Sequence, residues 1–294
     1  DAARAEAREK SRRYTTWGVI GAVVVGLIVL ALSQDFEWTF GAATMVFALG
    51  SGAAYAARKS VTDRIKTAIN EAIAKALDLQ YSASMTPGEP FARARAFSLL
   101  PGYDDDHFED LWWGALGQRP FTLHETRLTE ERGSGKSRRT VTVFPGSILS
   151  VGFARDFIGT TLIERDKNHR GFFGGEKDAI TLNDIELARV EMVDPRFEDM
   201  FSIWSSDGVE ARYLVHPEYV ERLVAVEEAY SGQNIRALFH GGELLIVLES
   251  GDMFESGSLD ATDDRTLLDR TIHQFTTLAE LAEKLNERPR AQFS

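Results

Sequence analysis

The chain has 294 residues, no cysteine and a formal net charge of −12, and 44% of its residues are apolar. This length and apolar content allow a substantial core, in one domain or in two small ones. Residues 1–66 carry a net charge of +3 and the remaining residues carry −15. Polyanions repel so acidic a domain, so we expect no nucleic-acid partner. The lack of cysteine excludes a thiol nucleophile and a cysteine-based zinc site.

Two charge-free apolar segments lie close together near the N-terminus, Thr16 to Ser33 and Trp38 to Ala57. The first would measure about 26 Å as a helix, close to the ~30 Å hydrocarbon core of a bilayer. The sequence therefore predicts a transmembrane hairpin with spans at about 16–33 and 38–57, and the lipid bilayer as a partner. The alternatives are a secretory signal peptide and a buried core helix.

Basic residues flank this predicted hairpin on both outer sides, while its short turn carries only Asp35 and Glu37. Lysine and arginine close to a span stay on the cytoplasmic side of a membrane. We therefore predict a two-span protein of a bacterial inner (plasma) membrane, with both termini and the rest of the chain in the cytoplasm.

Small residues recur at a spacing of four in the second apolar segment, where they would let helices approach closely. They serve either to pack the two segments on each other or to join copies of the chain. We treat Gly50, Gly52 and Ala56 as candidate interface residues and predict a homo-oligomer.

The chain divides by composition into three parts: the basic N-terminus and hairpin at 1–58, an amphipathic stalk helix at 59–81, and an α+β domain at 82–294. The third part alternates strand-like runs with a few helices, which indicates a mainly antiparallel sheet with flanking helices. One expected hairpin pairs residues 199–204 with 209–215 through Asp207-Gly208. Arg212 on its second strand would then form an ion pair with a nearby carboxylate, that of Glu198, Glu210 or Glu221.

Residues that could carry chemistry are sparse. The acidic cluster Asp104, Asp105, Asp106 and Glu109 is the best candidate for a metal site, because hard cations favour several carboxylates. The alternative is a solvated loop that begins a helix. Trp112 and Trp113 are either interface anchors or core residues. We predict no catalytic residue and no cofactor.

Three short motifs stand close together in the chain: Phe197-Glu198-Asp199-x-Phe201, then Glu210-Ala211-Arg212-Tyr213-Leu214, and Pro217-x-x-x-Glu221-Arg222-Leu223. They resemble motifs of a bacterial membrane-protein family known as domain of unknown function 3137. The resemblance implies an N-terminal membrane hairpin, a cytoplasmic α+β domain and a possible partner of the LemA type. It implies no catalytic residues.

These observations favour a membrane-anchored cytoplasmic scaffold or adaptor, which assembles with itself or with another membrane protein. A membrane-bound hydrolase that uses carboxylates and a sensor of a small ligand are the alternatives.

Overall fold

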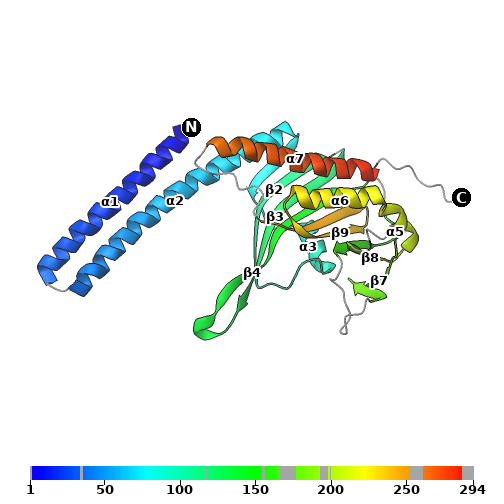
Figure 1. Cartoon of the computed structure of the whole chain (residues 1–294), viewed down its shortest axis with the longest axis horizontal. Helices are drawn as coiled ribbons and strands as arrows, with labels where there is room; N and C mark the ends of the chain where they lie inside the picture. Colours follow the sequence, from blue (N-terminus) through cyan, green and yellow to red (C-terminus); the bar gives the residue numbers. More distant parts are fainter. Residues whose placement is uncertain are drawn as a thin grey trace. The chain divides into compact units, whose positions relative to one another are not determined.

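The computed structural model describes residues 2–33, 36–116, 118–153, 156–165, 177–192, 198, 200–251 and 261–286 (Figure 1). The chain forms two compact units. One contains residues 1–69 and 255–267, and the other contains residues 70–254 and 268–294. The domain boundaries drawn from the sequence, 1–58, 59–81 and 82–294, stay a prediction.

The first unit is built on a helical hairpin of α1 (Ala2–Ser33) and the larger part of α2 (Phe36–Ala76) (Figure 1). Small side chains form its inner face: Ser11, Gly18 and Ala54 are buried. A Cβ atom on Gly21 would lie only 3.2 Å from Val46 Cγ1, so this glycine permits a close approach of the two helices.

Both helices run without a break from apolar into charged sequence: α1 includes Lys10 and Arg13, and α2 includes Lys59 and Arg64. Across the part of the chain that the structure describes, no helix is at once long enough and apolar enough to cross a membrane. The predicted transmembrane hairpin, with spans at 16–33 and 38–57, is therefore wrong. The predicted inner-membrane location, which depended on those spans, is overturned by the same finding.

The second unit contains a ten-stranded sheet with the strand order β1-β2-β3-β4-β10-β9-β5-β8-β7-β6. Neighbouring strands are antiparallel throughout. The strands are β1 (Leu79–Ser84), β2 (Asp105–Leu116), β3 (Arg119–Arg132), β4 (Arg139–Gly152), β5 (Thr161–Arg165), β6 (Ala179–Leu182), β7 (Ile185–Arg189), β8 (Phe201–Ser205), β9 (Gln233–His240) and β10 (Glu243–Glu249). This sheet agrees with the mainly antiparallel α+β architecture that the sequence predicts.

Helices cover both faces of the sheet. On one face lie α6 (Pro217–Ala229) and α7 (Ala261–Asn286), from which Tyr219 contacts Phe239 and Phe275 contacts Trp112 (Figure 1). On the other face, α3 (Glu89–Ala96) and the loop after it join a core cluster with residues of β4, β9 and β10. Two further short helices are η1 (Gly135–Ser137) and α5 (Gly208–Leu214).

The expected hairpin through Asp207-Gly208 is wrong, because residues 208–214 form helix α5 and not a strand. Asp207 is the N-cap of this helix, and its carboxylate accepts hydrogen bonds from the backbone N–H groups of Val209 and Glu210. Arg212 was expected to pair with a carboxylate, but the structure shows a different contact. Its guanidinium donates to the Gly208 carbonyl 3.4 Å away, one turn back on the exposed side of α5.

Candidate functional site

A recess of about 280 Å³ lies on the face of the sheet that carries α3. Loop residues 98–101, which follow α3, line one part of it. The strands contribute the rest of the lining, which consists of Val143, Leu162, Glu164, Arg236 and Glu249. This recess combines apolar and charged side chains, and it is the candidate functional site.

Strand pairing brings the charged residues of the recess together. Glu164 on β5 lies directly opposite Arg236 on β9, because these residues are register partners in the antiparallel pair. Glu249 is the last residue of β10, the next strand on the other side of β9. Leu162 and Glu164 are two residues apart on β5, so both side chains point to the same face of the sheet.

Hydrogen bonds hold each of the three charged groups in place. Arg236 Nη2 donates to Glu249 Oε1 at 2.9 Å, and Nη1 of the same guanidinium donates to the carbonyl of Leu99. Asn234 Nδ2 donates to the same Glu249 oxygen at 2.7 Å. Glu164 is only 3% exposed, and its Oε1 accepts a 3.0 Å hydrogen bond from the Trp204 indole N–H. The recess is therefore formed before any ligand binds.

The loop beside the recess is also tied to the fold. The backbone N–H of Leu99 donates to the carbonyl of Ala94 at 2.8 Å, which closes the end of α3. Ser98 adopts a left-handed backbone conformation with φ of 55°, which turns the chain out of the helix. Together with the Arg236 contact to Leu99, these bonds fix the position of the loop.

A second group of polar side chains anchors α3 nearby. Arg93 on α3 pairs with Glu243, and Glu243 also accepts a hydrogen bond from the Ser150 hydroxyl. His240 Nδ1 lies 2.8 Å from Thr160 Oγ1, and the pKa of His240 is lowered by burial and by the nearby Arg93. Ser150 donates to the Glu243 carboxylate, and the hydroxyl within hydrogen-bond distance of His240 is that of Thr160. We interpret it as structural.

His124 on β3 is buried on the α3 side of the sheet, beside Phe108, and its Nε2 has no hydrogen-bond partner among the described residues. Burial lowers the pKa of this imidazole from 6.5 to about 4. The unfolded chain therefore binds a proton at this position more readily than the folded chain does. Neutral His124 therefore contributes to the free energy of unfolding. This contribution is fully present above pH 6.5 and is lost as the pH falls from 6.5 toward 4.

We predict that His124→Phe flattens this acid dependence, because the variant has no group to protonate. At pH 5.5 the stability lost relative to pH 7.5 should be smaller than in the unmodified chain by about 1 kcal/mol. Urea unfolding at several pH values measures the effect. His107→Gln is a matched control at an exposed position of the neighbouring strand. Parallel pH profiles for His124→Phe and the unmodified chain would refute the prediction.

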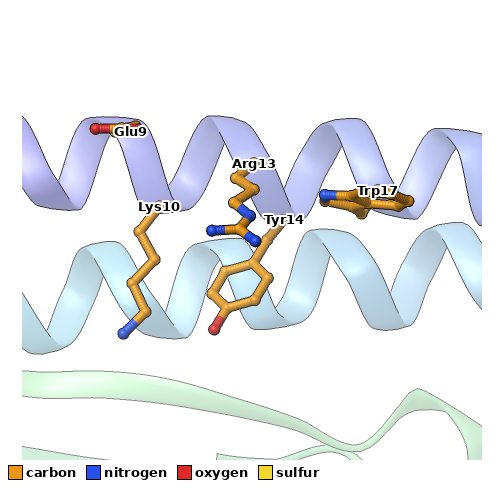
Figure 2. Close-up of a pocket in the computed structure, with 5 residues that line it drawn as sticks. All are labelled: Glu9, Lys10, Arg13, Tyr14 and Trp17. Carbon is orange, nitrogen blue, oxygen red and sulfur yellow. The ribbon is translucent and has the colours of Figure 1, made fainter.

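The helical unit has a different surface feature. A hollow of about 650 Å³ is lined by residues of α1: Glu9, Lys10, Arg13, Tyr14 and Trp17. Figure 2 shows Lys10 and Tyr14 projecting in the same direction, one helical turn apart, while Trp17 lies further along the helix. This segment thus combines basic and aromatic side chains at the start of a long apolar stretch.

The two tryptophans proposed from the sequence differ in their surroundings. Trp112 is fully buried, and its ring lies 4.8 Å from that of Tyr81 and 4.9 Å from that of Phe275. It therefore has the position of a core residue. Trp113, next along β2, is half-buried.

Among the helix residues proposed for an interface, Gly52 and Ala56 are exposed on α2. A Cβ atom on Gly52 would have nothing within 4 Å. Gly50 lies in the same helix, but its surroundings are outside the described residues.

The acidic cluster proposed as a metal site begins strand β2, and not a helix. Asp104, Asp105 and Asp106 are exposed, Glu109 is half-buried, and Asp104 accepts a hydrogen bond from the backbone N–H of Glu131. Throughout the described ranges, no three or more histidine, aspartate or glutamate side chains gather closely enough to hold a metal ion.

The residues of the recess were missed in the sequence. Glu164, Arg236 and Glu249 stand in three strand-like runs, and nothing in their spacing connects them. The available signal was a charged residue inside or at the end of an otherwise apolar strand, as in Thr161-Leu162-Ile163-Glu164. Such a residue is unusual on a buried sheet face.

Comparison with known proteins was made for sequence and for structure. The crystal structure of the mycobacterial trehalose monomycolate transport factor A, TtfA, is similar with a TM-score of 0.41 and 10% sequence identity, over 78% of this chain and 98% of that one. Comparison with curated proteins finds no match. Residues 142–287 match the family model described as "Protein of unknown function (DUF3137)". The part of the chain that matches the DUF3137 family therefore runs from within β4 to the end of α7.

Proposed function

We propose that this protein is a scaffold or adaptor that associates with a second copy of itself through the hairpin of α1 and α2. The observation that carries the proposal is the outer surface of this hairpin. Among the described side chains of the two helices, ten large apolar or aromatic ones are between 39% and 70% exposed. They are Tyr14, Trp17, Val19, Ile20, Val23, Val24, Met45, Phe47, Leu49 and Tyr55.

The arrangement of small and large residues supports this proposal. In most helical hairpins of water-soluble proteins, large apolar residues face inward. Here small residues such as Gly21 and Ala54 lie between the helices, and large apolar residues face outward. Monomeric proteins rarely expose large contiguous apolar areas, so the concentration of large apolar side chains on this one hairpin supports a binding surface.

A stripe along α2 explains why a second copy is the partner we propose. Met45, Leu49, Gly52 and Ala56 follow one another at intervals of four, three and four residues, so they share one side of the helix. All four are exposed. The side chains of this stripe are large at its Met45 end and small at its Ala56 end. Two copies related by a twofold axis, with their α2 helices antiparallel, would place Met45 and Leu49 of each copy against Gly52 and Ala56 of the other.

The test is the native mass of the purified full chain, measured by light scattering over a wide range of concentrations. We expect a dimer or a multiple of it. Gly52→Leu should weaken the association at least tenfold, because the added side chain fills the space that the partner's Leu49 would occupy. The open surroundings of Gly52 in its own chain leave the fold intact. Gly251→Leu is the matched control, since this glycine is also exposed and open but lies outside the hairpin.

Two outcomes would contradict self-association. One is a single-copy mass at every concentration. The other is a monomer that binds phospholipid vesicles through the same apolar side chains, which would give this surface a different occupant. The LemA-type partner implied by the family resemblance stays a prediction, and capture of such a protein by a monomeric chain would likewise count against the homo-oligomer.

A further inference from the structure

One end of the ten-stranded sheet is the strand β1, which pairs with β2 alone. In the part of the chain that the structure describes, no strand lies on the other side of β1. The backbone N–H and C=O groups along such an edge can pair with a further strand. The side chains of Gln80, Ala83 and Ser84 are exposed, so solvent and a partner can reach this strand.

The sequence of β1 lacks the features that usually protect an edge strand. Protected edges carry charged side chains or proline, contain a bulge, or are very short. β1 has six residues, none of which is charged or a proline. The strand at the opposite end of the sheet, β6, has only four residues and directly follows Lys177 and Asp178, which are exposed. Of the two ends of the sheet, β1 is therefore the one that is open to pairing.

The two faces of β1 differ in polarity. Tyr81 packs against Trp112 of β2 with ring centroids 4.8 Å apart, and Trp112 contacts Phe275 of α7. Successive side chains of a strand point to opposite faces of the sheet. The face toward α7 therefore carries the apolar residues Leu79, Tyr81 and Ala83, and the other face carries the polar residues Gln80, Ser82 and Ser84.

This alternation makes β1 complementary to a second copy of itself. A twofold axis perpendicular to the sheet, between the Tyr81 residues of two copies, would place Leu79 of each copy opposite Ala83 of the other. It would also place Gln80 opposite Ser82. Apolar side chains then meet apolar ones on one face, and polar side chains meet polar ones on the other.

Electrostatics is compatible with a contact between copies at this strand. The residues after position 66 carry a net charge of −15, so two copies repel each other over much of their surface. The uncharged strand β1 avoids this repulsion. The nearest charged residue in the chain before it, Asp78, would lie opposite Ser84 of the other copy, so no like charges oppose each other along the strand.

We infer that β1 pairs antiparallel with β1 of a second copy, which joins the two sheets into one. This contact goes beyond the proposed association through α1 and α2. It is independent of that association, since β1 and the helical hairpin belong to different units of the chain. Two separate twofold contacts on each chain would link more than two copies.

The test uses the full chain with Gly52→Leu, which weakens the association through the hairpin. Light scattering should still detect a dimer of this variant at high concentration. Adding Gln80→Lys and Ser82→Lys should weaken that dimer roughly tenfold, because lysine then lies opposite lysine at two positions. Gln80→Lys with Ser82→Glu should restore it, because each lysine then faces a glutamate.

The matched control places the same added charge on the opposite edge of the sheet. Ala179→Lys with Thr181→Lys has the same spacing on β6, where both positions are exposed, and should leave the dimer unchanged. Thermal melting of all variants establishes that they fold. Hydrogen–deuterium exchange on the unmodified chain gives a second measurement, since the amides of residues 79–84 should exchange more slowly as the protein concentration rises.

Three results would overturn the inference. They are a single-copy mass of the Gly52→Leu variant at every concentration, an equal effect of the β1 and β6 lysine pairs, and no recovery with the lysine–glutamate pair. A strand supplied by another protein would leave the mass unaffected by the β1 substitutions, which also overturns it. If Gly52→Leu itself does not weaken association, the hairpin contact fails, and the same β1 substitutions in the unmodified chain still decide this inference.

Discussion

Replacing Phe239 with alanine should lower the free energy of unfolding by about 3–5 kcal/mol. Phe239 lies on β9 at the centre of the sheet and is fully buried. Its ring centroid is 5.3 Å from that of Phe157 and 5.4 Å from that of Tyr219 on α6. Truncation removes these contacts and leaves a cavity that the surrounding strands and helix close only partly.

Urea unfolding of the full-length protein, followed by circular dichroism, measures this loss. Ile158→Ala is the control, because Ile158 is a large apolar residue of the same region that is 81% exposed. It should change the stability by less than about 0.5 kcal/mol. A loss below about 1 kcal/mol for Phe239→Ala would mean that the packing between β9 and α6 contributes far less than its burial indicates.

Gly146→Ala should destabilise the protein by about 3 kcal/mol, although only one methyl group is added. A Cβ atom at this position would overlap the Leu248 carbonyl oxygen and lie 3.0 Å from the Glu249 Cα atom. Both are backbone atoms of β10, the strand that pairs with β4 here. They cannot move aside without separating two central strands, so the cost comes from lost pairing and packing.

The same denaturation experiment measures this effect, with Gly102→Ala as the matched glycine control. A Cβ atom on Gly102 would have nothing within 4 Å, so this variant should be close to neutral. Equal stability of the two variants would show that β4 and β10 approach less closely at Gly146 than the structure indicates.

Local patterns in the sequence predicted those elements whose turn or cap residues permit only one conformation. The hairpin of β9 and β10 turns at Gly241 and Gly242, both of which adopt positive φ. Helix α6 begins with Pro217, which suits the first turn of a helix. Asp207-Gly208 misled, because this pair suits a hairpin turn and also the start of a helix, and the apolar residues of 209–215 fit a strand as well as a short helix. The Asp207 cap and the hydrogen bonds that the Glu210 carboxylate accepts from the N–H groups of Ile158 and Gly159 select the helix.

By itself, the sequence determined the mainly antiparallel α+β class and the family that residues 142–287 match, because alternation and short motifs are local properties of the chain. It misled about the N-terminal segments, whose charge-free stretches predict membrane spans that no described helix forms. Only the tertiary structure decided the rest. In the folded chain Trp112 is buried, and Glu164, Arg236 and Glu249 lie together although they come from three different strands. Strand order and register depend on the packing of the whole sheet, and short-range spacing carries no information about them.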